Sequence, residues 1–222
     1  MKSYLALFSI AIVLVSGCTN TSEKTGTSID TPMAASNSTS AQSPTAPAKD
    51  TSRPGDELMK AMAVSMDQMH SVQMSGDFDV DFANMMIAHH QGANDMAQVE
   101  LSQGKDEKMK AKAQEIITMQ KDEQQKLKDF VTSYKPSGMK HGEGELQQSA
   151  LKMMQKMKSM QMTGDVDKDF ATMMSSHHQD GISMSKMELK NGMSDKLKQM
   201  TQKSITNQEK DIKEFGSWLA NH

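Results

Sequence analysis

Two copies of the pattern Met-Met-x-x-His-His carry the side chains best suited to bind a metal in this sequence. The second copy follows the first at an offset of 88 positions (residue 177 against residue 89). Together they contribute Met85, Met86, His89, His90, Met173, Met174, His177 and His178. Residues three and four apart lie over one another on a helix, so each thioether pair lies one turn before an imidazole pair. Thioether sulfur selects Cu(I), and imidazole binds copper in either oxidation state. The pattern therefore predicts a Cu(I) site, with Ag(I) as a mimic and Cu(II) as a further candidate.

Further candidate ligands follow each copy along the same helical face. At about 100° per residue, Met96 and Glu100 share the face of His89, and Met184 and Glu188 share that of His177. A weaker candidate site precedes the first copy, where His70 is accompanied by three methionines, Met66, Met69 and Met74. A thioether needs no deprotonation, so we expect the methionine share of the affinity to persist at acidic pH, where the histidine share is lost.

The methionine content is unusual for a protein core. From residue 55 onward the sequence holds 22 of its 24 methionines against eight leucines. Methionine is a good helix former and fills irregular gaps, so any single methionine is explained by core filling alone. Leucine has equal helix propensity and specifies a core better, so core filling does not explain the preference for methionine across the whole set.

The elements that position these residues are predicted to be helices. Apolar residues recur at three-and-four spacing from about residue 55 to the end, and no segment alternates with the period of a strand. Glycine-rich breaks divide this region into helices at about 56–74, 77–103, 106–134, 145–162, 165–191 and 195–221. Gly104 is expected to follow the end of the second of them.

The two copies of the motif predict two similar halves, at about residues 56–134 and 144–221. Each half would consist of a short leading helix followed by a helical hairpin. Two hairpins that face one another across a pseudo-twofold axis form a four-helix-bundle core. We therefore expect an all-α fold, with residues 55–222 as one metal-binding domain.

The N-terminal segment has the pattern of an export signal. An apolar run from Leu5 to Val15 matches the core of a signal peptide, which we place at residues 1–17, and is too short to cross a bilayer. Residues 15–18 resemble the lipobox of bacterial lipoproteins, in which Cys18 receives the lipid; the alternative is an ordinary signal peptide that is cleaved elsewhere. Residues 18–54 are rich in Ser, Thr, Ala and Pro and predict a disordered tether. We expect a membrane-anchored lipoprotein facing the periplasm or the cell surface, with Thr19 favouring the outer membrane.

Composition excludes several classes of protein. Cys18 is the only cysteine, so the mature chain has neither an internal disulfide nor a thiolate metal site. The formal net charge is −3, with two Tyr, one Trp and six Phe, so the basic surface and the stacking platform of a nucleic-acid binder are both missing. No glycine-rich phosphate loop and no nucleophile elbow is present.

The paired signature Asp-x-Asp-x-Asp-Phe-Ala-x-Met-Met-x-x-His-His-Gln resembles the family known as domain of unknown function 305. The resemblance covers about residues 56–222 and includes Glu-Leu at residues 100–101 and 188–189 and Gln120-x-x-Glu123 in the next helix. It implies a ferritin-like helical fold. The Met-rich exported members of this family resemble CopM-type proteins, which bind Cu(I) and protect against copper. The second half departs from the first in two places, with Asp180-Gly181 for Gly92-Ala93 and Asp211 for Glu123.

Two other functions compete with copper binding. A ferritin-like bundle often hosts a di-iron carboxylate enzyme, which needs two Glu-x-x-His motifs. The sequence has Met86-x-x-His89 and Met174-x-x-His177 at that spacing instead, although Glu100, Glu188, Glu123 and Asp211 could supply carboxylates. The second alternative is a lipoprotein whose methionine-rich faces bind a partner protein. The expected function is copper sequestration, tolerance or hand-off to a copper-transfer protein, without catalysis.

Overall fold

The computed structural model describes residues 55–136, 138 and 142–222 of the chain. The predicted signal peptide (1–17), the tether (18–54) and Cys18 lie outside these residues. All of the described residues belong to one compact unit, Lys49–His222. They form six helices: α1 (Asp56–Ser71), α2 (Phe78–Gln103), α3 (Glu107–Ser133), α4 (Glu143–Lys158), α5 (Val166–Asn191) and α6 (Asp195–Leu219). None of the helices within the described part of the chain has the length and apolarity needed to span a membrane.

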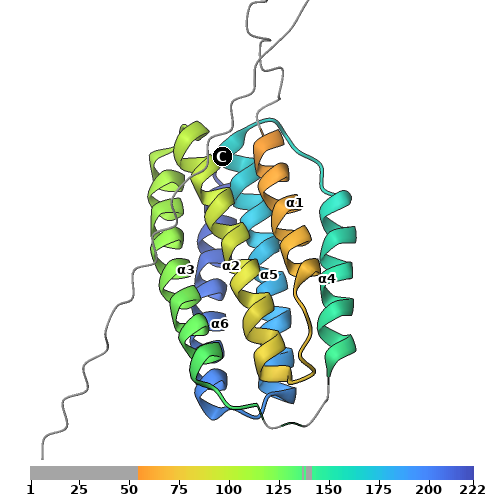
Figure 1. Ribbon diagram of the computed structural model, residues 1–222. Coiled ribbons are helices and arrows are strands. Elements are labelled where there is room, and N and C mark those ends of the chain that lie inside the picture. Colours follow the sequence, from red (N-terminus) through yellow and green to blue (C-terminus); the bar gives the residue numbers. More distant parts are fainter. Residues whose placement is uncertain (1–54, 137, 139–141) are drawn as a thin grey trace, which may run out of the picture. The chain divides into compact units, whose positions relative to one another are not determined.

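The two motif helices, α2 and α5, lie side by side at the centre of this unit (Figure 1). Helix α3 packs on α2, and α6 packs on α5, which gives the two expected hairpins. The short helices α1 and α4 also pack against one another and against this central pair. The all-α bundle built from two repeated hairpins, each with a short leading helix, is confirmed.

The long helices begin and end close to the expected residues, whereas α1 and α4 end earlier than expected. α1 stops at Ser71 instead of Met74, and α4 stops at Lys158 instead of Met162. The residues that follow form turns in which Gly76 and the equivalent Gly164 have φ values of 86° and 87°. A residue with a side chain is strained at such angles, so glycine is required at this point of each turn.

Aspartates of the first Asp-x-Asp-x-Asp motif shape the turn between α1 and α2. Asp77 is the N-cap of α2, and its carboxylate accepts a hydrogen bond from the backbone N–H of Val80 (3.2 Å). Asp81 accepts hydrogen bonds from the backbone N–H of Ser75 (2.7 Å), from the Ser75 hydroxyl (2.7 Å) and from the backbone N–H of Gly76 (3.0 Å). The bond to Asp77 satisfies a donor that the start of a helix leaves unpaired, and the bonds to Asp81 hold the residues before the helix in a turn.

The same bonds recur in the second half. Asp165 caps α5 through the backbone N–H of Lys168 (3.2 Å). Asp169 accepts hydrogen bonds from the backbone N–H and the hydroxyl of Thr163 (2.8 and 2.7 Å) and from the backbone N–H of Gly164 (3.0 Å). The internal repeat is therefore present in the structure as well as in the sequence, and it includes individual hydrogen bonds.

The middle aspartate of each motif joins the two halves. Asp79 accepts hydrogen bonds from two backbone N–H groups in the loop between α5 and α6, those of Met193 (2.9 Å) and Ser194 (2.8 Å). Asp167 does the same for residues 105 and 106 in the loop between α2 and α3, at 2.8 to 3.1 Å. The start of each motif helix is thus held against the end of the other, so α2 and α5 are antiparallel and are tied at both ends.

A buried glutamate accompanies each of these middle aspartates. Glu188 and Glu100 are both completely buried. Burial, together with the charge of Asp79 and a hydrogen bond to it, raises the pKa of Glu188 to about 9. Burial, together with a hydrogen bond to Asp167, raises the pKa of Glu100 to about 8. Both glutamates are therefore protonated and neutral at physiological pH.

The glutamate protons make the stability of the fold depend on pH. In the unfolded chain glutamate ionises near pH 4.5, so between that pH and about 9 the folded state binds more protons and stability falls as the pH rises. The variant Glu188→Gln has a neutral amide of similar size, which can donate a hydrogen bond but has no proton to lose in this pH range. At pH 9 it should melt above the wild type by about 3 °C or more, equivalent to roughly 1 kcal/mol. Thermal denaturation from pH 5 to 9 measures this, and Glu209→Gln, an exposed change on α6, is the control. If the melting temperatures of Glu188→Gln and the wild type changed with pH in parallel, the predicted role of the Glu188 proton would be contradicted.

A candidate metal centre between the two motif helices

His89 of α2 and His177 of α5 meet at the contact between the two halves. Their ring centroids lie 3.7 Å apart, and the ring planes differ by 24°, so the rings are stacked. Each side chain is 1% exposed. Neither the Nδ1 nor the Nε2 atom of either ring has a hydrogen-bond partner. Leaving a buried polar atom unpaired costs about 1–3 kcal/mol, so four such atoms at one place require a functional explanation.

Both rings are neutral at physiological pH. Burial lowers the pKa of His89 well below 6.5, and the charges of the neighbouring His90 and His178 lower it further. Burial lowers the pKa of His177 in the same way, with His89 and His178 adding to the effect. A neutral imidazole keeps a lone pair on one nitrogen, and a metal can bind that nitrogen without displacing a proton.

Two glycines make room for the stacked rings. A Cβ atom at Gly181 of α5 would lie 2.9 Å from Cε1 of His89, and one at Gly92 of α2 would lie 3.3 Å from Nε2 of His177 and overlap Ser65 of α1. The first departure between the halves, Asp180-Gly181 for Gly92-Ala93, shifts the glycine by one position. Each half nevertheless places a glycine beside the histidine of the other half.

The outer histidine of each pair is held by a carboxylate of the following helix. Nε2 of His90 lies 3.0 Å from Oε2 of Glu123 on α3, and Nε2 of His178 lies 3.2 Å from Oδ2 of Asp211 on α6. Burial raises the pKa of Glu123, but the hydrogen bond and charge of His90 outweigh it and hold this pKa below its usual value. Nδ1 of both histidines is buried without a partner. A carboxylate that fixes one ring nitrogen while the other stays available is the arrangement that orients histidine ligands in metal sites.

The four imidazoles form one row across the bundle. The centroids of His89 and His90 lie 6.2 Å apart, and those of His177 and His178 lie 6.3 Å apart. With the central stack, the order along the row is His90, His89, His177 and His178. The structure thus brings both predicted histidine pairs together at one place.

All six predicted methionine ligands of the motif helices are buried in the same core. Their exposed fractions lie between 0% and 2% for Met85, Met86, Met96, Met173, Met174 and Met184. Met86 lines a cavity together with His90. The helical spacing of the motif places Met85 one turn before His89, and Met173 one turn before His177.

The weaker candidates divide into two groups. His70, Met69 and Met74 line a second cavity of about 230 Å³ together with Met85, so the predicted outer site is brought together, and Met66 is buried beside it in the core. Glu100 and Glu188 are not brought to the histidines. Glu100 lies 11 positions after His89 (100 against 89), or about 16 Å along the helix axis, and Asp167 is the carboxylate that acts on its pKa.

Across residues 55–136, 138 and 142–222, no group of three or more His, Cys, Asp or Glu side chains is placed to hold a metal ion. Glu123 and Asp211, which could have served as carboxylate ligands, face His90 and His178. The candidate ligands of the centre are therefore the imidazoles and the buried thioethers of the same two helices.

An all-helical bundle of two repeated halves, joined through a row of buried histidines, is the class of protein that these observations define. The chain belongs to the family described as domain of unknown function DUF305, whose profile matches residues 23–131 and 129–219. The family assignment and the all-α fold expected from the sequence are confirmed. No curated protein matches the chain.

Two solved structures of this family share the fold. A DUF305 fragment from Deinococcus radiodurans is 16% identical, with a TM-score of 0.50, and the match covers 65% of this chain and 97% of that one. A DUF305 protein from Streptomyces coelicolor, described as a candidate secreted protein, is 18% identical, with a TM-score of 0.54, and the match covers 67% of this chain and 95% of that one.

Proposed function

We propose that this protein binds Cu(I), with Ag(I) as its mimic, through the histidines and methionines of its two motif helices. The observation that carries the proposal is the stacked pair His89 and His177, whose four ring nitrogens are buried without a hydrogen-bond partner. A buried histidine that serves packing alone usually has a partner for its N–H group. A ligand that binds these nitrogens would offset the cost of burying them without hydrogen-bond partners.

The chemistry of the site favours a soft cation of low charge. The central imidazoles are neutral, and the carboxylates Glu123 and Asp211 are already bound to the outer histidines. Buried thioether sulfur is the other abundant donor. Neutral nitrogen and sulfur ligands suit Cu(I) and Ag(I), whereas Mg(II), Ca(II) and Mn(II) prefer oxygen ligands.

The geometry favours one ion in each half. Lone pairs of an imidazole lie in the plane of its ring, and the planes of His89 and His177 are stacked with an angle of 24° between them. Lone pairs of two stacked rings run alongside one another and do not converge on a point between the rings. We therefore infer two equivalent sites, each combining the histidines of one motif with the methionines one turn before them.

The proposed role is copper sequestration or hand-off outside the cytoplasm. The signal-like N-terminus and the lipobox-like residues before Cys18 support export and a lipid anchor, and the Streptomyces protein is itself described as a candidate secreted protein. Thioether ligands suit that location, because unlike thiols they form no disulfides in an oxidising compartment.

The test is an anaerobic titration of the metal-free protein with Cu(I) in the presence of a competing chelator, with Zn(II) and Fe(II) in parallel. We expect two tight Cu(I) equivalents per chain and much weaker binding of the other two metals. Tight Fe(II) binding with oxygen consumption would support a di-iron enzyme in place of this proposal. Absence of any metal binding would overturn the proposal and favour a partner-binding surface.

Methionine sulfur is tested by the variant Met85→Leu/Met86→Leu/Met173→Leu/Met174→Leu. Leucine conserves the volume and the apolar surface, so each change should cost less than about 1.5 kcal/mol in stability. Affinity for Cu(I) should fall at least tenfold, which is roughly 1.4 kcal/mol of binding free energy, while affinity for Zn(II) should stay within about twofold. Met109→Leu/Met153→Leu, a pair of buried methionines on α3 and α4 that are not candidate ligands, is the control. Unchanged Cu(I) affinity in the quadruple variant would show that sulfur at the motif is a packing group.

A further inference from the structure

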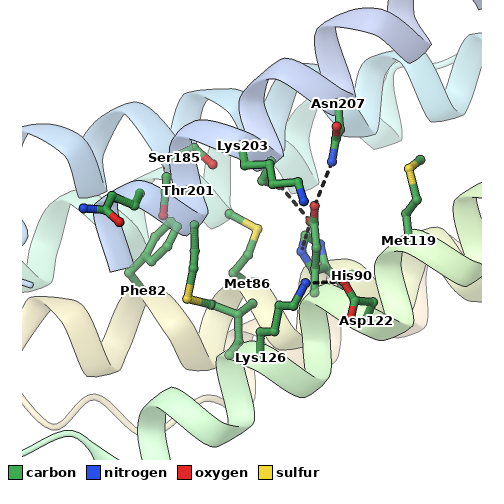
Figure 2. Close-up of a pocket in the computed structure, with 15 residues that line it drawn as sticks. Phe82, Met86, His90, Met119, Asp122, Lys126, Ser185, Thr201, Lys203 and Asn207 are labelled. Carbon is green, nitrogen blue, oxygen red and sulfur yellow. Dashed lines mark hydrogen bonds and ion pairs between the residues drawn. The ribbon is translucent and has the colours of Figure 1, made fainter. Parts of the chain in front are cut away.

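A cavity of about 450 Å³ lies between α2, α3, α5 and α6 and reaches the histidine row on one side (Figure 2). Its inner wall contains His90 and Met86, which are 1% and 2% exposed. Its rim contains exposed polar side chains, Asp122, Lys126, Gln199 and Lys203. The cavity therefore runs from solvent to an imidazole of the candidate metal centre.

Three thioethers line this cavity at different depths. Met119 of α3 and Met200 of α6 are half-buried, and Met86 of α2 is buried. Figure 2 shows the Met86 and His90 side chains close together and Met119 further along α3. A soft ion that enters from solvent would meet sulfur at the outer part of the cavity and again next to His90.

Two hydroxyl groups in the wall have no partner. The Ser185 Oγ and Thr201 Oγ1 atoms are buried without a hydrogen bond, and both residues line the cavity. Their side chains are 1% and 3% exposed. The wall therefore offers polar atoms to a guest such as water or a partly hydrated ion, which an apolar packing void would not do.

Different side chains stand at the place that the repeat relates to this cavity. At an offset of 88 positions, Leu127 of the cavity corresponds to Phe215, and Met200 corresponds to Lys112. Phe215 is completely buried and packs edge-on against Phe170, at 5.6 Å between centroids. Lys112 binds Asp211 (3.2 Å), Glu115 (2.6 Å) and Glu214. At these two equivalent positions, the larger Phe215 ring replaces Leu127, and Lys112 with its three carboxylate partners replaces Met200.

We propose that this cavity is the port through which a soft metal ion is exchanged with the buried histidine row, and that the second half is sealed by Phe215 and Lys112. The inference rests on the proposed function and adds the route. Cu(I) held by a donor molecule would pass by ligand exchange to the outer sulfurs of Met119 and Met200, then to Met86 and His90, so it is never without a ligand. The ion carries its charge with it, and no bond other than those to the metal is formed or broken.

The test places at position 127 the type of side chain that the repeat has at the equivalent position 215. In the variant Leu127→Phe, a ring occupies part of the 450 Å³ cavity, so the fold should be retained, as circular dichroism and thermal melting will show. We expect Cu(I) uptake from a chelator complex, followed by stopped-flow absorbance, to slow at least tenfold. Stoichiometry and equilibrium affinity should stay within about threefold of the wild type, because the buried ligands are unchanged.

The matched control is Leu151→Phe, which narrows the second cavity beside His70. It should leave the uptake rate within about twofold of the wild type. Slow uptake by Leu151→Phe together with normal uptake by Leu127→Phe would move the port to the other cavity and overturn the inference. Wild-type rates in both variants would overturn it as well.

A second variant tests the sulfurs independently of cavity size. Met119→Leu/Met200→Leu should slow Cu(I) uptake at least fivefold without changing the number of ions bound. If equilibrium titration shows tight Cu(I) binding but none of these variants changes the rate, the port inference fails and the proposed function stands. If the wild type binds no Cu(I) at equilibrium, the proposed function fails and the port fails with it.

Discussion

The double variant His89→Leu/His177→Leu is expected to be more stable than the wild type without metal and to lose at least a hundredfold in Cu(I) affinity. Both effects have one cause. The four ring nitrogens of this pair are buried without partners, so an apolar side chain of similar volume removes a desolvation penalty of about 1–3 kcal/mol for each unpaired group. The same change removes the central nitrogen ligand of both proposed sites.

Two measurements check this expectation. Thermal unfolding of the metal-free proteins should place the variant about 4 °C or more above the wild type, since roughly 1 kcal/mol corresponds to 2–4 °C for a domain of this size. Competitive Cu(I) titration should show the loss of affinity. A variant that keeps two tight Cu(I) equivalents would show that the stacked pair is not the metal centre, whatever its stability.

The outer histidines provide the contrasting variant. His90→Leu/His178→Leu should also weaken Cu(I) binding, but it should destabilise the fold, because Glu123 and Asp211 each lose a buried imidazole partner. Glu123 then keeps Ser204 and Asn207, and Asp211 keeps Lys112. Replacing all four histidines at once would combine both effects and obscure them. Under the proposed function, His89 and His177 would serve the ligand alone, whereas His90 and His178 would also serve the fold.

Local signals in the sequence were sufficient to predict the helices. Asp77, Asp106 and Asp165 begin long helices as N-caps, and each is followed by an apolar pattern of helical period. The ends of α1 and α4 were predicted three to four residues late, because the methionines at 74 and 162 continue that period. The turns depend on hydrogen bonds to Asp81 and Asp169, which periodicity does not reveal.

The candidate site was predicted in its composition and not in its geometry. Helical spacing placed Met85 and His89 on one face, and the repeat predicted a second copy. That His89 stacks on His177 depends on the antiparallel contact of α2 with α5, which no local pattern encodes. Glu100 illustrates the limit of a helical projection: it shares the face of His89 but lies three turns away, because a projection discards the rise along the axis. Met200 and Thr201 carry no motif, and only their place beside a cavity identifies them.

The second large effect is expected from the aspartates that tie the two halves together. Asp167→Ala removes an acceptor from the backbone N–H groups of residues 105 and 106 and leaves Glu100 without its partner. Hydrogen bonds to a charged group contribute about 1.5–3 kcal/mol each, so the variant should lose at least about 3 kcal/mol of stability. Denaturant unfolding measures the loss, and Asp79→Ala should produce a similar one at the other end of the α2–α5 pair.

Asp165→Ala is the matched control, because it stands two positions earlier in the same motif. Asp165 is exposed and accepts a single capping hydrogen bond from Lys168, and the loss of such a cap costs about 1 kcal/mol. Equal losses for the two variants would mean that Asp167 acts as a local cap and not as a tie between the halves. If it is a tie, Asp167→Ala should also weaken Cu(I) binding although Asp167 is not itself a proposed ligand, because the stack of His89 on His177 requires α2 and α5 to stay in register. Asp165→Ala should leave Cu(I) binding unchanged.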